Sequence, residues 1–435
     1  MMQIKKDSGI KWVGEIPSDW KALKLRYICD KITDYTASGS FASLAENVIY
    51  RDYEDYAMLV RTADLSNKRE TSKVYVDEHA YNYLSNSNLF GGEVILPNIG
   101  SVGEVYLYQP IYERATLAPN AIMIQAPEEV EKFLYYYFST YGAFDDLKNL
   151  GNATTQIKFN KTQLRNLKVV IPPKEKMLKI NCFLDRRCEK IESFVTVVQQ
   201  QIDTLEELKR SVVYEAVSKG IKKAELKDTD SDVWAKIPKD WQLVDVKYLF
   251  EIVKRIAGKE GIDILSVTQQ GLKVKDISSN EGQIADNYSG YQIVYPTDYV
   301  MNHMDLLTGW VDCSTMFGVT SPDYRVFRLM DKANNSLRYY KYVMQCCYMC
   351  RIFYSLGQGV STLGRWRLQT SSFLNFKVPA PPLKEQEIIA DYIEEKVSGI
   401  ERLINLKIEQ QRVLEDYKKT LIADYVTGKK EVSES

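Results

Sequence analysis

Residues 169–187 read VVIPPKEKMLKINCFLDRR, and a second stretch at 377–396 reads KVPAPPLKEQEIIADYIEEK. When the two Pro-Pro pairs are superimposed, the second stretch lies 209 positions after the first. The agreement continues without a gap beyond the quoted residues and matches Ile191 with Ile400 and Leu205 with Leu414. An internal repeat governs the interpretation of a whole fold. The chain is therefore interpreted as two related halves.

A second repeated motif lies near the start of each half. The chain reads GEIPSDW at 14–20 and AKIPKDW at 235–241, so Ile-Pro-x-Asp-Trp recurs after 221 positions. Each half then has the same order: this motif, a variable block, a Pro-Pro pair and a long apolar-periodic segment. The repeated parts are typical of a scaffold, and we interpret Trp20 and Trp241 as packing anchors.

The segments after the Pro-Pro pairs predict two long helices. Pro suits a helix start, and residues 174–219 contain neither Pro nor Gly. At 1.5 Å per residue, each helix would be roughly 60–70 Å long. Apolar residues recur at spacings of three, four or seven, which is typical of a coiled-coil stripe. They include Ile180, Leu184, Ile191 and Leu205 in the first helix, and Ile389, Ile393, Ile400 and Leu414 in the second.

Two arrangements of these helices are open. Each helix could pack along its own globular domain. Alternatively, the two helices could pack on each other as an antiparallel pair with pseudo-twofold symmetry, and internal duplication favours this second arrangement.

The variable blocks differ strongly from each other. GGEVILPNIGSVGEVYLY (91–108) and YQIVYPTDYVMNHMDLLTGWVDCS (291–314) both contain short β-prone runs broken by Gly and Pro. The fold class is therefore predicted as α+β, with two domains of mixed α/β character joined by the two helices. We expect a first domain at 1–168, a central helix at 169–222, a second domain at 223–376 and a C-terminal helix at 377–435.

Composition limits the class of protein. With 435 residues, of which 45% are hydrophobic, the chain can form two or three domains with cores of their own. No apolar run reaches the length of a membrane span, so we expect no membrane partner. Seven cysteines without a framework spacing suit a reducing cytoplasm, which is the expected location.

The charge distribution points to nucleic acid although the formal net charge is only -1. Residues 147–174 and 332–384 contain several Lys and Arg but no Asp or Glu. These segments occupy equivalent places in the two halves. A basic patch suits phosphate contacts. The alternative is a solvated basic face, and the duplication favours DNA.

Motifs for catalysis are missing from the sequence. There is no phosphate-binding loop, no G-x-G-x-x-G and no Asn-Pro-Pro-aromatic tetrapeptide. His303 and His79 are interpreted as structural residues, and Cys347 with Cys350 as core packing. Asp391 and Glu394 resemble part of a nuclease site, but a helix would spread their side chains around its surface. We therefore predict no catalytic residue and no metal ligand.

These features together resemble the specificity subunit of a Type I restriction-modification system. The resemblance covers nearly the whole chain and rests on both duplicated motifs and on two blocks similar to target-recognition domains. In the first block, GGEVILPNIGSVGEVYLY resembles the family's Gly-Asp-Ile…Gly-Ser-x-Gly stretch, with Glu93 where Asp is common. In the second, GVTSPDYRVF resembles another recognition-domain type through Tyr324.

The resemblance implies a division of labour. Each block would bind one part of a split, asymmetric target in double-stranded DNA, and the helices would set the spacer between the parts. The helices would also dock two modification subunits, which bring S-adenosylmethionine and methylate adenine. Restriction subunits would add an ATP- and Mg-dependent motor and nuclease. This chain would hold no cofactor and would not be an enzyme.

The expected site residues follow from this assignment. Subunit docking is expected on the eight apolar helix residues named above. DNA contacts are expected from Arg61, Asn98, Ser101, Thr154, Thr155, Gln156, Lys158, Lys161, Gln269, Asn302, Thr308, Arg365 and Arg367.

Three alternatives stay open at this point. The chain could be a single-chain restriction-methylation enzyme, although it lacks the motifs such an enzyme needs. It could be a coiled-coil scaffold without a DNA role, in which case it should ignore duplex DNA at low salt. It could also be the recognition subunit of a methylation-only defence system.

Overall fold

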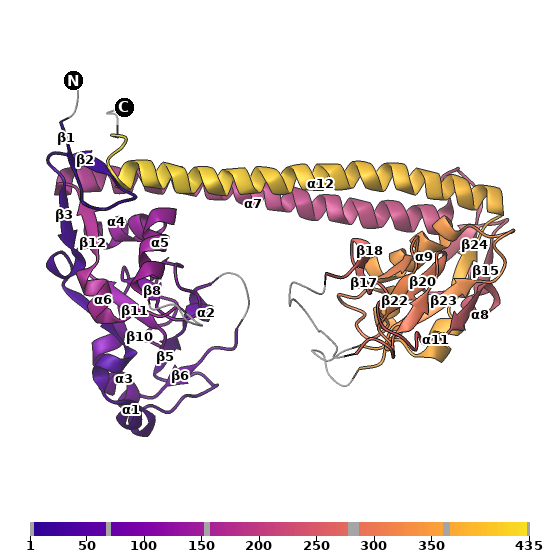
Figure 1. Cartoon of the computed structure of the whole chain (residues 1–435), viewed down its shortest axis with the longest axis horizontal. Helices are drawn as coiled ribbons and strands as arrows, with labels where there is room; N and C mark the ends of the chain where they lie inside the picture. The colour runs from indigo at the N-terminus through magenta and orange to yellow at the C-terminus, as the bar shows by residue number, and fades with distance from the viewer. Residues whose placement is uncertain (1–3, 67–70, 152–156, 277–286, 360–365, 433–435) are drawn as a thin grey trace. The chain divides into compact units, whose positions relative to one another are not determined.

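The computed structural model describes residues 4–66, 71–151, 157–276, 287–359 and 366–432. The chain divides into two compact units. Unit 1 consists of residues 1–197 and 410–435, and unit 2 consists of residues 198–409. Each unit contains small sheets, short helices and a part of each of two long helices (Figure 1).

A four-stranded antiparallel sheet forms the centre of unit 1. Its order is β4–β11–β8–β9, with bounds Lys31–Asp34, Ala121–Gln125, Val94–Pro97 and Tyr106–Leu107. Successive side chains of a strand point to opposite faces. Ile122 and Leu96 therefore lie in one core, whereas Met123 and Ile95 lie in another. Both faces of this sheet are consequently buried.

Different elements cover the two faces of this sheet. On one face lie α4 (Glu128–Phe138) and α5 (Tyr141–Leu150), which contribute Phe133 and Leu147 to the shared core. The other core includes residues of a mixed sheet in the order β6–β5–β10–β7, with bounds Tyr75–Val76, Ala57–Val60, Ala115–Leu117 and Asn88–Leu89. Short helices complete the unit: η1 (Leu25–Tyr27), η2 (Tyr35–Ser38), α1 (Phe41–Asn47), α2 (Thr62–Leu65), α3 (Glu78–Tyr83), η3 (Ser85–Ser87) and α6 (Lys161–Asn166).

Unit 2 repeats the central sheet of unit 1. Its order is β16–β23–β20–β21, with bounds Phe250–Val253, Arg325–Leu329, Asp298–Met301 and Val311–Cys313. The surrounding elements differ, because two-stranded sheets β17 (Leu265–Thr268) with β18 (Gly271–Val274) and β19 (Gln292–Val294) with β22 (Gly318–Thr320) are present instead of the mixed sheet. Its helices are α8 (Val246–Leu249), α9 (Leu337–Met349), α10 (Ile352–Ser355) and α11 (Thr370–Leu374).

Two pairs of short strands are also duplicated. Unit 1 has β1 (Lys5–Asp7) with β2 (Glu15–Pro17) and β3 (Lys21–Lys24) with β12 (Lys168–Ile171). Unit 2 has β13 (Leu226–Asp228) with β14 (Lys236–Pro238) and β15 (Gln242–Asp245) with β24 (Lys377–Ala380). In each half the first of these pairs brings in the Ile-Pro-x-Asp-Trp motif.

The tryptophans of that motif are packing anchors, as predicted. Trp20 is 2% exposed and packs edge-on against Phe133. Trp241 is 1% exposed and donates a hydrogen bond from Nε1 to Glu385 over 3.0 Å. Neither indole is available to DNA.

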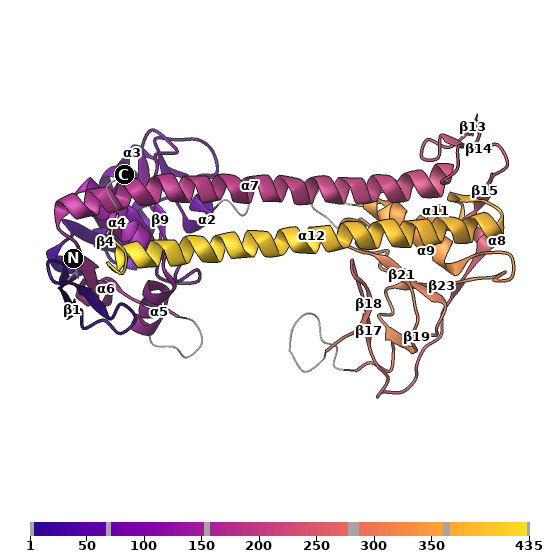
Figure 2. The same cartoon turned by 90° about the horizontal axis from the view of Figure 1, so that it is seen from above.

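The long helices are α7 (Lys174–Lys219) and α12 (Leu383–Val426). In unit 1, Phe183 of α7 packs on Tyr425 of α12 with ring centroids 4.4 Å apart. In unit 2, Lys209 of α7 pairs with Glu401 of α12 over 3.1 Å. The start of each helix thus lies beside the end of the other, which confirms the predicted antiparallel packing (Figures 1 and 2).

The helix boundaries differ slightly from those predicted. Residues 168–171 and 377–380 are strands, so each helix starts several residues later than expected. Gly399 lies inside α12 without interrupting it. Other apolar residues of the two helices, such as Phe194 and Leu403, are exposed. A regular spacing of apolar residues predicts a helix, but it does not indicate which turns of the helix are packed against another part of the chain.

Candidate nucleic-acid interface

The loop after β8, residues 98–105, brings together two predicted parts of the interface in unit 1. Asn98 donates a hydrogen bond from Nδ2 to the carbonyl oxygen of Phe159 over 3.0 Å, and Phe159 N donates to Asn98 O over 3.3 Å. Ile99 and Lys158 form an adjoining β-bridge. Asn98 and Ser101 are therefore brought into one region with Lys158, which is far from them in sequence, and this region is here called the β8 site. Ser101 and Lys158 are exposed, whereas Asn98 is buried and donates its amide N–H to Phe159, so Asn98 has a structural role instead of the predicted DNA contact.

In unit 2 the loop after β20, residues 302–310, likewise brings together predicted parts of the interface. Leu368 N donates to His303 O over 3.0 Å, and Leu306 N donates to Trp366 O over 3.3 Å. Arg367 lies between these two tie points on the returning segment and forms a β-bridge with Gln358. Asn302, Thr308 and Arg367 are thereby brought into one region, here called the β20 site.

The two sites are equivalent in the fold. β8 and β20 each lie third in the order of a four-stranded antiparallel sheet, and each is followed by a loop that bonds to a segment near the end of the variable block. Lys158 and Arg367 are both exposed, and neither has an acidic partner within the part of the chain that the structure describes. Free cationic side chains at duplicated positions suit contacts with phosphates or base edges.

A buried carboxylate holds the turn before each of these strands. Glu93 is 2% exposed and accepts hydrogen bonds from the backbone N–H of Phe90 and of Gly91 over 2.8 and 2.9 Å. Gly91 and Gly92 have φ values of 115° and 97°, which only glycine adopts without strain. The Gly-Gly-Glu stretch of the sequence is thus a structural turn that aims β8 at its loop.

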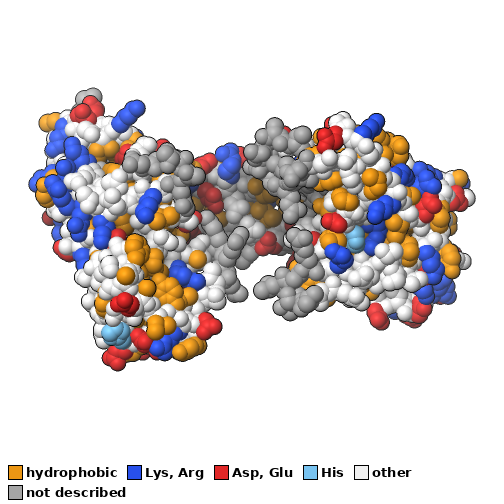
Figure 3. All heavy atoms as spheres, turned by 60° about the horizontal axis from the view of Figure 1, so that its bottom comes forward, with side chains coloured by type: hydrophobic (Ala, Val, Ile, Leu, Met, Phe, Trp, Pro, Cys, Tyr) orange, Lys and Arg blue, Asp and Glu red, His pale blue; other side chains and the backbone are white. Residues whose placement is uncertain are grey.

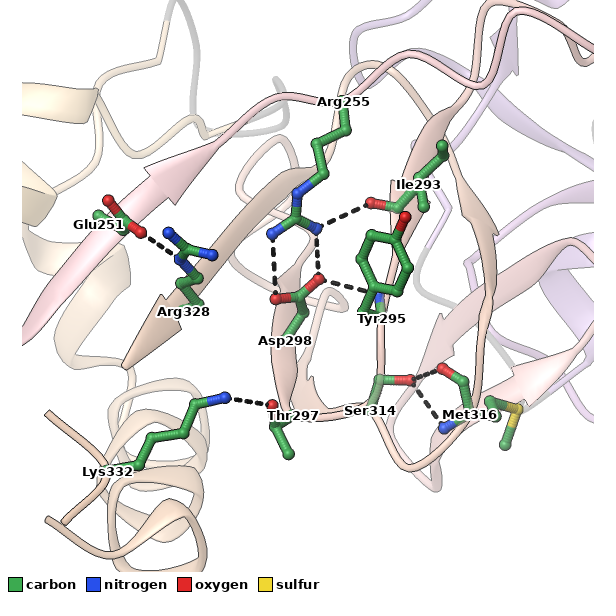
Figure 4. A network of polar contacts seen from close by, with 10 residues as sticks. All are labelled: Glu251, Arg255, Ile293, Tyr295, Thr297, Asp298, Ser314, Met316, Arg328 and Lys332. Atoms are coloured by element: carbon green, nitrogen blue, oxygen red, sulfur yellow. Dashed lines mark hydrogen bonds and ion pairs between the residues drawn. The ribbon is translucent and has the colours of Figure 1, made fainter. Parts of the chain in front are cut away.

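Asp298 plays the corresponding part in unit 2. It is 3% exposed and accepts hydrogen bonds from Arg255 over 2.6 Å and from the backbone N–H of Tyr295 over 2.9 Å (Figure 4). Arg255 also lies over the ring of Tyr295. A charge-assisted pair of this kind fixes the backbone on which the β20 site depends.

His303 belongs to the β20 site, although the sequence indicated only a structural residue. Its Nδ1 atom is buried and has no hydrogen-bond partner among the described residues. Burial, together with the positive charges of Arg325 and Arg367, lowers the pKa of the His303 imidazole to about 4. The ring is therefore neutral at pH 7. No pattern around a lone histidine could have indicated this environment.

Arg325 is a second residue that the sequence did not single out. It is 5% exposed and donates to Leu368 O over 3.0 Å and to Thr370 Oγ1 over 3.3 Å. Burial lowers the pKa of its guanidinium to about 10. In the described part of the chain it pairs with no carboxylate, so it adds positive potential beneath the β20 site while it holds the returning segment in place.

The acid-free segments are not uniformly basic in three dimensions. Lys161 pairs with Asp34 over 2.8 Å, and Lys174 with Glu129 over 2.6 Å. Arg338 pairs with Glu387, Asp391 and Glu394, which also accounts for the nuclease-like residues of α12. Acids distant in sequence thus neutralise several cations of these segments, and for Lys161, which is a predicted DNA contact, an ion pair competes with DNA.

The remaining predicted DNA contacts fall into three groups. Arg61 is bonded to Asp64 over 2.9 Å and caps α2, whereas Gln269 is exposed at the turn between β17 and β18. Ser101 and Thr308 are exposed in the two loops. Four residues lie outside the described residues: Thr154, Thr155, Gln156 and Arg365. A DNA contact at any of these positions stays a prediction.

The predicted docking residues on the helices require a correction. Most of them are buried within the chain and cannot present a surface to a partner: Ile180, Leu184, Ile191, Ile389, Ile393 and Ile400. Leu205 and Leu414 are half-buried. Exposed apolar side chains occur at other positions of α7 and α12: Leu178, Phe194, Val197, Leu208, Ile388, Leu403, Leu406, Ile408, Val413 and Tyr417.

Further features of the described residues concern metal binding, the cysteines of the C-x-x-C motif and membrane-spanning helices. No group of three or more His, Cys, Asp or Glu among them is arranged to hold a metal ion. Cys347 is buried in the core of unit 2 and Cys350 packs against that core, as predicted. No helix formed by the described residues combines the length and the apolar composition that crossing a membrane requires.

Comparison with known proteins adds a family to this geometry. Residues 17–207 and 238–410 each match the family described as "Type I restriction modification DNA specificity domain". The two matched regions together take in most of the chain and correspond to its two halves.

Individual relatives match along nearly their whole lengths. Two of them are from Methanocaldococcus jannaschii. The "Putative type I restriction enzyme MjaX specificity subunit" is 23% identical, and the match covers 99% of this chain and 98% of that protein. The "Type I restriction enzyme MjaVIII specificity subunit" is 21% identical, and the match covers 99% of this chain and 97% of that protein. A solved chain described under "Structural basis underlying complex assembly and conformational transition of the type I R-M system" has a TM-score of 0.63 and 13% identity, and covers 94% of this chain and 98% of its own. At that identity, the likeness concerns the fold alone.

Proposed function

The chain belongs to the family of Type I restriction modification DNA specificity domains, and on this premise we propose that each of its units binds one part of a bipartite DNA target. The observation that carries the proposal is the duplicated loop at the end of β8 and of β20. Each loop is tied to a returning segment that exposes an unpaired cation, Lys158 in one unit and Arg367 in the other. Such a surface suits a combination of phosphate contacts and base contacts.

The two parts of the target should differ in sequence. The equivalent loops are surrounded by different elements, a mixed four-stranded sheet in unit 1 and two small antiparallel sheets in unit 2. The β8 site exposes Ser101 and Lys158, whereas the β20 site exposes Thr308 and Arg367. Because base recognition depends on the donors and acceptors that a surface presents, unlike surfaces bind unlike sequences.

The helices would connect recognition to chemistry. α7 and α12 would set the unread spacer, and their exposed apolar side chains would dock two modification subunits. These subunits would supply S-adenosylmethionine and flip the target adenine into their own pockets. Restriction subunits with ATP and Mg would complete the assembly. The chain itself would hold no cofactor and catalyse no step.

Mapping DNA methylation in cells that carry this chain with its cognate modification subunit tests the proposal. The expected result is a two-part motif with unlike halves separated by an unread spacer. A continuous or palindromic motif would contradict it. Cells that carry the chain without the modification subunit should show no new methylation, and methylation there would favour the single-chain enzyme.

A further inference from the structure

A two-stranded ribbon recurs in both units, but its charge does not. In unit 1, β3 and β12 place Lys24 directly opposite Lys168. In unit 2, β15 and β24 place Asp245 opposite Lys377. Positions 24 and 245 are related by the repeat offset of 221, and positions 168 and 377 by the offset of 209. The same structural position therefore has two like charges in one unit and a complementary pair in the other.

The ribbon of unit 1 is also uncompensated by its surroundings. Among the described residues, neither Lys24 nor Lys168 has an acidic partner. Arg26 extends the basic surface and lies over the ring of Tyr27, with 4.8 Å between the guanidinium carbon and the ring centroid. Tyr27 is 66% exposed. We call Lys24, Arg26, Tyr27 and Lys168 the basic ribbon.

The counterpart in unit 2 is neutralised. Lys247, equivalent to Arg26, pairs with Asp245 over 2.9 Å, and Lys377 pairs with Asp230 over 2.8 Å. Like charges placed directly opposite each other destabilise a strand pair. In unit 2 the lysines near this position are neutralised by acidic residues, whereas in unit 1 the repulsion between Lys24 and Lys168 remains. A bound anion would remove this repulsion.

The position of the basic ribbon connects it to the β8 site. Lys158 of that site is followed by α6, and α6 is followed by Lys168 of β12. Figure 3 shows basic side chains gathered along the left edge of unit 1, where Figure 1 places β3 and β12. The basic ribbon is thus joined through α6 to the site proposed above to bind DNA.

We propose that the basic ribbon binds the sugar-phosphate backbone of duplex DNA adjoining the part of the target bound by unit 1, without recognising its sequence. The inference rests on the proposed function. Lys, Arg and Tyr are residues that commonly contact phosphate oxygens. An acidic protein surface is the competing occupant. A modification subunit that docks on the repeated scaffold twice would need the feature in both units, and unit 2 lacks it.

The test measures DNA binding by the full chain assembled with its modification subunits. Lys24→Gln with Lys168→Gln removes two phosphate contacts, so the slope of log affinity against log salt should decrease in magnitude by about 1.8. The loss should be the same for all flanking sequences, and the methylation motif should not change. The wild-type complex should bind a duplex that ends close to the half-motif of unit 1 less tightly than a duplex that extends beyond it. The double variant should bind the two duplexes with equal affinity.

Two further variants separate this effect from misfolding. Lys24→Asp places in unit 1 an Asp directly opposite a Lys, as unit 2 has at the equivalent position, so it should fold without a lower Tm and still show a salt slope of smaller magnitude. Lys247→Gln with Lys377→Gln removes lysines at equivalent positions that are already paired, and its salt slope should equal that of the wild type.

The outcomes are distinguishable. If the wild-type complex does not bind its own methylation motif, the proposed function fails. If it binds and the ribbon variants show wild-type salt and length dependence, the basic ribbon does not contact DNA. If the variants fold but no longer assemble with modification subunits, the basic ribbon is a protein-docking surface and the inference is overturned.

Discussion

Arg367 and Lys158 occupy equivalent sites but offer DNA different chemistry. A guanidinium can bond guanine O6 and N7 at the same time, whereas an ammonium acts as a compact point charge. Their residue types were visible in the sequence, because both lie in segments without acids. The partner of Lys158 across its β-bridge was not, since Ile99 lies far from it in the chain.

Arg367→Ala should relax the methylation motif at one position of one half. A bidentate contact with guanine accounts for about 1–3 kcal/mol of discrimination, so the other bases should become acceptable there while the second half-motif is retained. Methylome mapping provides the measurement. Arg328→Ala is a matched control, because Arg328 is already bonded to Glu251 (Figure 4) and should leave the motif intact. An unchanged motif for Arg367→Ala would place this side chain away from the bases.

His303 gives unit 2 a predictable response to acid. Its pKa is about 4 in the folded chain and lies below the ordinary value of 6.5. The unfolded chain therefore binds more protons between these values, so the imidazole contributes stability that is complete above pH 6.5 and is lost as the pH falls toward 4. Thermal unfolding at pH 7.5 and 5 should show a larger decrease in Tm for the wild type than for His303→Gln. Equal decreases would show that other groups cause the acid sensitivity.

At the scale of elements, helices were easier to predict than sheets. The end of α7 was predicted closely, because the helix stops at Lys219 and Gly220 follows with a φ of 73°. Pro at a helix start and Gly after its end are local signals. The order β4–β11–β8–β9 has no such signal, because strand pairing depends on contacts between distant residues.

The difference between local signals and contacts between distant residues also explains why the charge predictions were only partly successful. A run without acids is a local property, but an ion pair is a property of the fold. Lys377 is neutralised by Asp230, which lies in the preceding part of its own unit. Its repeat equivalent, Lys168, faces Lys24. The sequence therefore located basic segments correctly but did not indicate which of their side chains stay unpaired.

For the whole molecule, duplication was the decisive sequence signal. It predicted two domains with equivalent scaffolds, and unit 1 and unit 2 each have the same central sheet, the same two strand ribbons and an anchoring tryptophan. What duplication could not predict is divergence. Equivalent positions such as Arg26 and Lys247 have acquired different partners, and only the folded contacts reveal it.

The length of α7 and α12 should determine the spacer in the DNA target. We consider inserting one heptad after Val198 and one after Lys407, its equivalent in the repeat. Both insertions lie between the same two ion pairs, Glu192 with Lys418 and Lys209 with Glu401, so the pairing on either side is kept. Seven residues preserve the coiled-coil period and add about 10.5 Å.

This variant should methylate targets whose spacer is about three base pairs longer, because the rise per base pair is about 3.4 Å. Both half-motifs should stay the same, since the β8 and β20 sites are untouched. Three base pairs also turn the second half-site by roughly a quarter to a third of a DNA turn. A target library with spacers from the original length to six base pairs longer therefore measures length and rotation together. Insertion in α7 alone should abolish methylation at every spacing, because the two helices would no longer match in length. A double-insertion variant that is active only at the original spacing would show that something other than helix length sets the gap.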